Sequence, residues 1–155
     1  MVEWHGAGGA WGIGTDSHYS TSTAEELRIL ECGKRLELRR RNVIARPQAD
    51  GREVHSGRLL FDTALAGGEQ CSAQGGGALV QGRRADLVML DAGSPVLLGH
   101  GPGTALDAWI LGGTRNPVRD VMVAGRWVIR DGRHADEERI LDGYRAAMAR
   151  LQGKQ

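Results

Sequence analysis

A carboxylate, a hydroxyl and an imidazole stand side by side near the start of the chain, at Asp16-Ser17-His18. They close a run of low polarity, Trp11–Thr15, and precede Thr21-Ser22-Thr23-Ala24-Glu25-Glu26. That second run is typical of a helix start, where Ser or Thr accepts an exposed amide proton and a Glu three residues on reaches back. The predicted order is strand, carboxylate, loop and helix. At the carboxyl end of a barrel strand, such a carboxylate can bind a divalent metal and take a proton from metal-bound water.

Asp16 is therefore the candidate catalytic and metal-binding residue, with a turn or cap residue as the plainer interpretation of its type. The sequence shows no complete set of metal ligands and no complete catalytic motif. The five histidines form no H-x-H or H-E-x-x-H spacing, and Cys32 and Cys71 form no C-x-x-C. Ser17 beside His18 lacks the G-x-S-x-G elbow of serine hydrolases. Glu25 and Glu26 suit the first turn of a helix rather than acid catalysis.

Composition and charge restrict the class of protein. The 155 residues can hold one domain, or one domain and a fragment of another. Twenty Lys and Arg against nineteen Asp and Glu give a net charge of +1, which predicts neither a nucleic-acid partner nor an anionic membrane. No apolar run is long enough to cross a bilayer, and the two distant cysteines suit a reducing cytoplasm. We therefore expect a cytoplasmic protein.

The first half of the chain favours helices. Good helix formers run from Ala24 to Arg41, with Glu31 and Arg35 spaced to pair. The basic run Arg39–Arg41 is interpreted as a solvated helix end rather than an anion or nucleic-acid patch. A polar connection at 48–52 follows, and then a short apolar helix, 59–66, that Gly67-Gly68 should end. Gly75–Gly77 lacks the lysine of a phosphate loop and predicts a flexible connector.

From residue 85 the pattern changes to strands. A short buried strand is predicted over 86–91, with Asp86 and Asp91 making turn hydrogen bonds. A hairpin follows, with strands at 121–123 and 127–129 around Ala124-Gly125. Residues 108–111 predict a strand or a short helix, and 136–151 predicts a final helix with one apolar face. These strands are too few to make a stable sheet alone, so we expect structural partners that this chain does not contain.

Two separated segments make the chain resemble the amidohydrolase superfamily of metal-dependent hydrolases. Gly12–His18 is similar to the eighth strand of that family's barrel, whose aspartate binds or adjoins the metal. Gly82-Arg83-Arg84-Ala85-Asp86-Leu87-Val88-Met89-Leu90-Asp91 is similar to the segment that returns the family's chain to a small β-sandwich, and Pro117–Arg133 resembles the closing hairpin of that sandwich. Within the superfamily, Asp16–His18 followed by Glu25–Leu36 and Arg39–Val43 most resembles the formimidoylglutamate deiminases.

The resemblance implies an α/β fold that is the C-terminal part of a TIM (β/α)8 barrel, a part of a β-sandwich and a C-terminal helix. The chain would then divide into a barrel part at residues 1–78, a sandwich part at residues 79–133 and a C-terminal helix at residues 134–155. The implied reaction hydrolyses N-formimino-L-glutamate to N-formyl-L-glutamate and ammonia at zinc or another divalent metal, with Asp16 taking the proton of water. The family's H-x-H and further histidines are absent from this sequence, so we expect the isolated chain to bind zinc poorly and to be inactive.

Two alternatives stay open at this point. One is another amidohydrolase, a deaminase or chlorohydrolase of the guanine or chlorotriazine type. The other is a non-enzymatic α+β interaction module whose exposed strand edges pair with a partner chain. For the enzyme, the expected partner is a small-molecule substrate, with a homodimer as the expected assembly.

Overall fold

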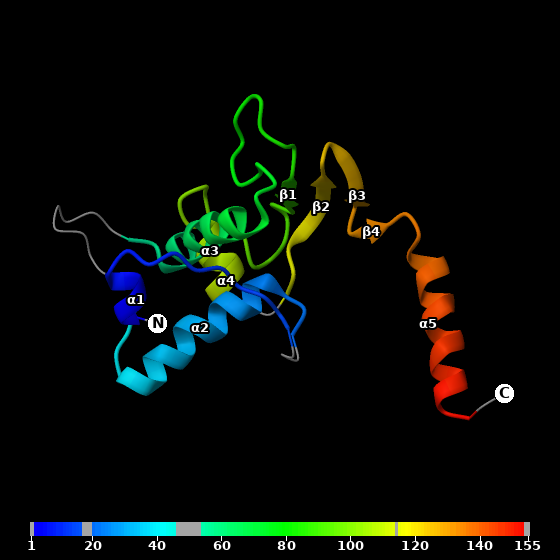
Figure 1. Ribbon diagram of the computed structural model, residues 1–155, viewed down its shortest axis with the longest axis horizontal. Helices are drawn as coiled ribbons and strands as arrows, with labels where there is room; N and C mark the ends of the chain where they lie inside the picture. The colour runs from blue at the N-terminus through cyan, green and yellow to red at the C-terminus, as the bar shows by residue number, and fades with distance from the viewer. Residues whose placement is uncertain (1, 17–19, 46–53, 114, 154–155) are drawn as a thin grey trace. The chain divides into compact units, whose positions relative to one another are not determined.

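The computed structural model describes residues 2–16, 20–45, 54–113 and 115–153 of a mixed α/β chain (Figure 1). The chain forms two compact units. The first comprises Met1–Arg84 and Asp91–Pro117, and the second comprises Ala85–Leu90 and Val118–Gln155. Ser17, His18 and the polar connection predicted at 48–52 lie outside the described residues.

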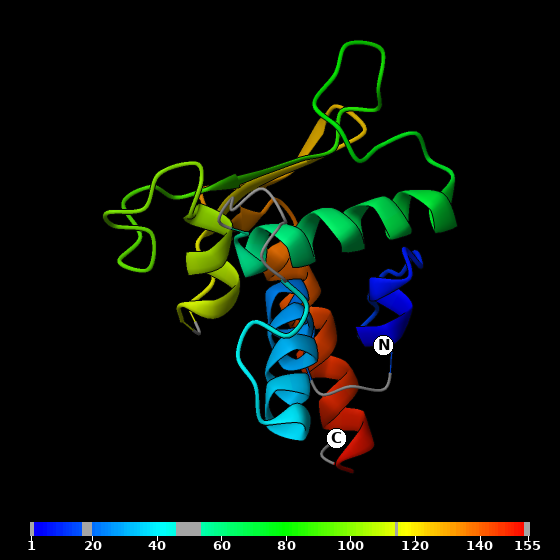
Figure 2. The ribbon, with the colours of Figure 1, turned by 90° about the vertical axis from the view of Figure 1, so that its left-hand side faces the viewer.

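The first unit is helical and has its core between three helices. It contains α1 (Val2–Gly6), α2 (Thr23–Leu38), α3 (Ser56–Ser72) and α4 (Ala105–Leu111). Helix α4 packs against both α2 and α3, and Figure 2 shows the start of α3 beside α4. The apolar side chains that fill this contact are almost fully buried: Leu27, Leu60, Trp109 and Ile110.

A polar contact also ties α2 to the end of α4. The guanidinium of Arg28 donates to the carbonyl oxygens of Ile110, at 2.6 Å, and of Gly113. These carbonyls lie in and just after the last turn of α4, where no intrahelical donor is available. Arg28 therefore satisfies groups that burial would otherwise leave without a partner. Residues 108–111, which the sequence left between strand and helix, are helical.

The helix predicted over 24–41 is present as α2, which ends at Leu38 because Arg39 adopts a left-handed conformation with φ 51°. The helix predicted over 59–66 differs more. Helix α3 continues through Gly67 and Gly68 to Ser72, so the expectation that these glycines end it is wrong. Gly67 instead provides space, because a methyl group on it would overlap the carbonyl group of Trp11. Gly75–Gly77 does lie in a connection without helix or strand.

The segment Trp11–Thr15 forms no strand, in contrast to the sequence prediction. A strand exists through hydrogen bonds to a neighbouring strand. The sheet that the described residues form uses only segments after residue 86, and none of its strands pairs with Trp11–Thr15. The segment instead runs over α3, with Trp11 buried against it.

The second unit holds a four-stranded antiparallel sheet in the order β1-β2-β3-β4. Its strands are β1 (Leu87–Leu90), β2 (Val118–Val123), β3 (Arg126–Arg130) and β4 (Arg133–His134). The strand predicted over 86–91 and the predicted hairpin are present, but the expected burial of that strand is wrong, since Val88 is 51% and Met89 40% exposed. Strand β4 had no sequence prediction. Val88 pairs with Val121 and Met122 pairs with Trp127, which fixes the register of β1, β2 and β3.

Two tight turns of the same design connect these strands. Ala124 and Gly125 between β2 and β3 have φ 48° and 79°, and Asp131 and Gly132 between β3 and β4 have φ 50° and 76°. Two consecutive residues with positive φ are the mark of the type I′ turn, whose twist matches that of paired strands. The carboxylate of Asp86 accepts the amide proton of Ala124 at 2.7 Å, so the predicted turn role of Asp86 is confirmed.

Helix α5 (Glu137–Leu151) follows the sheet, close to the predicted range of 136–151. None of its residues is buried. Its apolar side chains are largely exposed: Ile140 (52%), Leu141 (45%), Tyr144 (61%) and Leu151 (82%). Helix α5 is thus amphipathic but has no apolar cover among the described residues. No helix in the described part of the chain has the length and apolar character needed to span a membrane.

Candidate active site

Asp16 lies in the first unit, in a turn between Trp11–Thr15 and the start of α2. Its side chain is exposed and its backbone has φ 30°, a left-handed value that Asp adopts more readily than most residues. Gly14 lies close to it, since a methyl group there would be 3.4 Å from Oδ1 of Asp16. The turn therefore presents the carboxylate outward from a compact backbone, which leaves it accessible to a ligand.

Backbone packing and one aromatic side chain hold the segment that leads to Asp16. Trp11 is 9% exposed, and its Nε1 donates to Nδ1 of His5 at 3.3 Å. Gly12 lies against the C-terminal part of α3, where a methyl group on it would be 3.4 Å from the amide nitrogen of Gly68. The segment is therefore anchored from two sides, by α1 and by α3.

A hydroxyl and carboxylate network starts α2 shortly after Asp16. Ser22 is the N-cap and accepts the amide proton of Glu25 at 3.4 Å, which confirms the predicted helix start. Glu25 does not reach back to the N-cap amide. Its Oε2 lies 2.5 Å from Oγ of Ser20, and that same Oγ accepts the amide proton of Ser22. Ser20 thus completes the cap in the place expected of Glu25.

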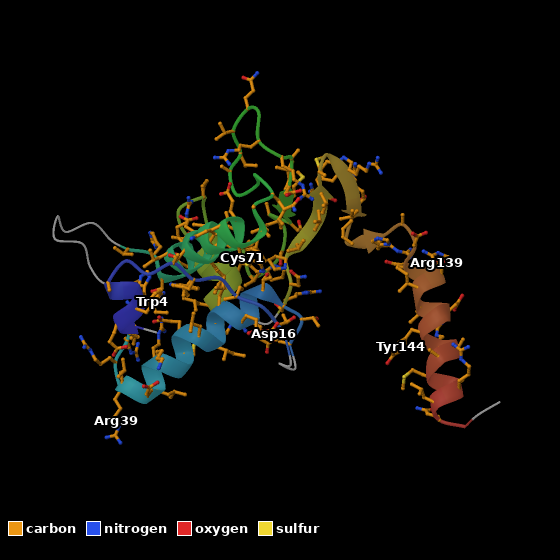
Figure 3. All side chains as sticks on the ribbon, viewed as in Figure 1. Trp4, Asp16, Arg39, Cys71, Arg139 and Tyr144 are labelled. Atoms are coloured by element: carbon orange, nitrogen blue, oxygen red, sulfur yellow. The ribbon has the colours of Figure 1, made fainter. Side chains whose placement is uncertain are left out.

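The basic run is far from Asp16. Figure 3 shows Asp16 beside the first turn of α2 and Arg39 at the other end of this helix. Sixteen residues of helix separate the two ends, a rise of about 24 Å. Arg39, Arg40 and Arg41 are exposed, as the interpretation of a solvated helix end requires. They cannot act on the same small ligand as Asp16.

The described residues do not fit a metal centre. Among them, no three His, Cys, Asp or Glu side chains lie close enough together to hold a metal ion. The four described histidines have other neighbours: His5 bonds Trp11, His55 lies by Asp107, His100 contacts Thr104, and His134 accepts the amide proton of Asp136. Asp16 alone cannot hold zinc tightly, because zinc sites need three or four protein ligands.

Sequence reasoning missed most contacts of two acidic residues that organise the first unit, Glu31 and Asp107. Glu31 is fully buried, accepts the amide protons of Val43 and Ile44 at 2.9 and 3.1 Å, and pairs with Arg35 at 2.7 Å. Only the pair with Arg35 was predictable from the i,i+4 spacing. The Val43 and Ile44 contacts depend on how the chain folds back after α2, which no local pattern encodes.

A second arrangement, which is partly buried, joins α3 and α4. Oδ1 of Asp107 accepts the amide proton of Gly57 at 2.6 Å, and Oδ2 lies 3.0 Å from Nδ1 of His55. A carboxylate and an imidazole at this distance are compatible with general-base chemistry. Asp107 also caps the first turn of α3, because His55 at the N-cap makes no side-chain cap bond. The Asp107 carboxylate is therefore best explained as the cap of α3.

Comparison with known proteins places the chain. No family model matches the sequence. Formimidoylglutamate deiminase of Pseudomonas aeruginosa is 52% identical over 144 residues, which are 93% of this chain and 31% of that protein. The crystal structure of an amidohydrolase from Brucella melitensis superimposes on 98% of this chain with a TM-score of 0.83 and 35% identity. The chain covers 32% of that structure.

A third protein is similar to this chain in fold. The zinc-complexed crystal structure of atrazine chlorohydrolase from Arthrobacter aurescens gives a TM-score of 0.71 at 24% identity, over 94% of this chain and 31% of that one. The chain therefore spans about a third of the length of each of these relatives. Within that span, the resemblance of this chain to the amidohydrolases, and to formimidoylglutamate deiminase among them, is confirmed.

Proposed function

We propose that this chain corresponds to the C-terminal third of an amidohydrolase that hydrolyses N-formimino-L-glutamate to N-formyl-L-glutamate and ammonia. The 52% identity to formimidoylglutamate deiminase over 93% of the chain carries this proposal. The domain division at residues 78 and 133, the barrel and sandwich assignments and a homodimer are parts of the same proposal.

Asp16 is the residue of this chain that we assign to the reaction. Its carboxylate is exposed at the end of an anchored segment and can accept a proton from water and return it to the leaving ammonia. The carboxylates of Asp107 and Glu31 are unsuited to this role. Both accept hydrogen bonds from backbone amides, and breaking these bonds would disrupt the local structure.

Zinc is the metal that the resemblance implies, but the described residues of this chain cannot hold it. Its ligands would have to come from a polypeptide that carries the family's histidines. We therefore expect the isolated chain to bind zinc weakly and to release no ammonia from N-formimino-L-glutamate. Robust ammonia release by the purified chain would contradict this part of the proposal.

A chimera tests the assigned substrate. The matched third of the Pseudomonas aeruginosa enzyme is replaced by the corresponding residues of this chain, and ammonia release from N-formimino-L-glutamate is measured. Activity within about tenfold of the parent enzyme is expected. The change Asp16→Asn in the chimera should lower kcat by about 10²-fold or more, since a positioned acid–base group contributes that much. Asp62→Asn, an exposed carboxylate paired with Arg58, is the matched control.

The alternatives appear as distinct outcomes of the same experiment. A folded chimera that is inactive on N-formimino-L-glutamate but releases chloride from a chlorotriazine would favour the other amidohydrolase class. A chimera that does not fold, beside a compact isolated chain by size-exclusion chromatography, would favour the interaction module. Either result overturns the proposed deiminase.

A further inference from the structure

Two adjacent glycines interrupt the interior of α3, at Gly67 and Gly68. Glycine inside a helix costs about 1 kcal/mol relative to alanine, so each position needs a reason. The two differ in their surroundings. A methyl group on Gly68 would meet no heavy atom of the described chain within 4 Å beyond its own helix and neighbours, so that site is open.

Gly67 faces the backbone that leads to Asp16. A methyl group on it would overlap the carbonyl group of Trp11 and lie 2.9 Å from the amide nitrogen of Gly12. Gly12 also lies next to α3, since a methyl group there would be 3.4 Å from the amide nitrogen of Gly68. The contact is therefore backbone against backbone, with no flexible side chain between them that could yield.

Such a contact transmits displacement directly. If α3 gains one methyl group at Gly67, either the helix or Trp11–Gly12 must shift, because both sides are main chain. Trp11 is also fixed on its other side by the bond from its Nε1 to His5. The displacement is then passed along the next four residues to Asp16, where Gly14 already lies close to the carboxylate.

We propose that Gly67 is a positioning residue for Asp16. Its missing side chain lets α3 support the Trp11–Gly12 backbone at the distance that places the Asp16 carboxylate. This inference rests on the proposed role of Asp16 in hydrolysis, and it adds a residue on a different helix, 51 positions further along the chain.

The first test needs no activity. Hydrogen exchange of the amides of residues 11–16 is measured by mass spectrometry in this chain, with Gly67→Ala compared to Gly68→Ala. Both changes add the same methyl group and the same helix propensity to the same helix. We expect exchange to accelerate at least tenfold in Gly67→Ala and to stay unchanged in Gly68→Ala. Equal exchange in the two variants would overturn the inference, whether or not the proposed reaction is correct.

The second test uses the chimera. Gly67→Ala should lower kcat for ammonia release at least tenfold with little change in KM, because small misplacements of a catalytic group cost about 10²-fold. The loss of kcat should persist under conditions in which circular dichroism shows the variant to be as fully folded as the parent chimera, whereas a variant that is merely less stable has the parental kcat once it is folded. Gly68→Ala should change neither kcat nor KM. If Gly67→Ala does not fold, Gly12→Ala adds a methyl group at the same contact, 3.4 Å from the amide nitrogen of Gly68, and should lower kcat by less than tenfold.

The outcomes separate the two proposals. A parent chimera without deiminase activity refutes the proposed function, and the exchange measurement still decides the contact. An active chimera in which folded Gly67→Ala and folded Gly68→Ala have the same kcat refutes the positioning role alone.

Discussion

Glu31 shows how one buried carboxylate can hold a chain reversal. It lies in α2 with no exposed surface and accepts amide protons from Val43 and Ile44, which are themselves buried. Glu31→Ala leaves both amides without an acceptor, and each unsatisfied buried donor costs about 1–3 kcal/mol. We expect the free energy of unfolding of the first unit to fall by about 2–4 kcal/mol.

Urea unfolding in a Trp127→Phe background measures this change, since Trp4, Trp11 and Trp109 then report on the first unit alone. Glu37→Ala is the control on the same helix, because Glu37 is exposed and pairs only across one turn with Lys34. That pair should contribute less than about 0.5 kcal/mol. Equal effects of the two changes would contradict the structural role of Glu31.

Asp120 makes the sheet of the second unit sensitive to pH. The amide of Asp131, at 2.8 Å from Oδ1, and then the guanidinium of Arg119 hold the pKa of Asp120 below its ordinary value of 3.8. Because the pKa is lower in the folded chain, ionised Asp120 stabilises the sheet above the unfolded pKa. This stabilisation is lost as the pH falls through the folded pKa.

Unfolding should be followed by the fluorescence of Trp127, with the other tryptophans replaced, from about pH 5 down to about pH 2. We expect the midpoint denaturant concentration of Asp120→Asn to fall less steeply with acid than that of the parent. Asp142→Asn, an exposed residue paired with Arg145, should keep the parental slope. Parallel slopes for all three proteins would be evidence against the role of Asp120.

At the scale of elements, the hairpin turns offer a gain in stability. Ala124 occupies a left-handed position at φ 48°, which is unfavourable for alanine, and Gly125 follows at φ 79°. Asn-Gly is the preferred pair for a type I′ turn. Ala124→Asn should therefore stabilise the second unit by about 0.5–1 kcal/mol, and Gly125→Ala should destabilise it by about 1 kcal/mol or more. Opposite shifts in urea midpoint test both, and shifts of the same sign would exclude this turn type.

The same elements show what the sequence could predict. Local sequence patterns were enough to predict the hairpin, strand β1 and the cap of α2, because turn residues, short apolar runs and N-cap hydroxyls act within a few positions. It failed at Gly67-Gly68, where the helix continues and Gly67 makes room for Gly12, 55 residues earlier in the chain. It also failed at Trp11–Thr15, because a strand requires partners that no local pattern can supply. The candidate role of Asp16 could be predicted from its neighbours in sequence, whereas the role proposed for Gly67 could be inferred only from the fold.

At the scale of the whole molecule, the two units differ in how much apolar surface they bury. The first unit encloses Leu60 and Ile110 completely. In the second, α5 has no buried residue, and Val88, Met89 and Trp127 of the sheet are each at least 40% exposed. A sheet of short strands whose apolar side chains stay exposed is of marginal stability. We therefore expect the second unit to unfold at lower urea concentration than the first.

This difference predicts that replacing a leucine costs much more stability in the first unit than in the second. Leu60→Ala removes a fully buried side chain between α3 and α4 and should destabilise the first unit by about 2–5 kcal/mol. Leu141→Ser on α5 removes a side chain that is 45% exposed and should change the stability of the second unit by less than about 0.5 kcal/mol. Urea unfolding followed separately in each unit measures both. A loss above 1 kcal/mol for Leu141→Ser in the isolated chain would mean that α5 is covered there, since only burial gives a leucine side chain that much weight.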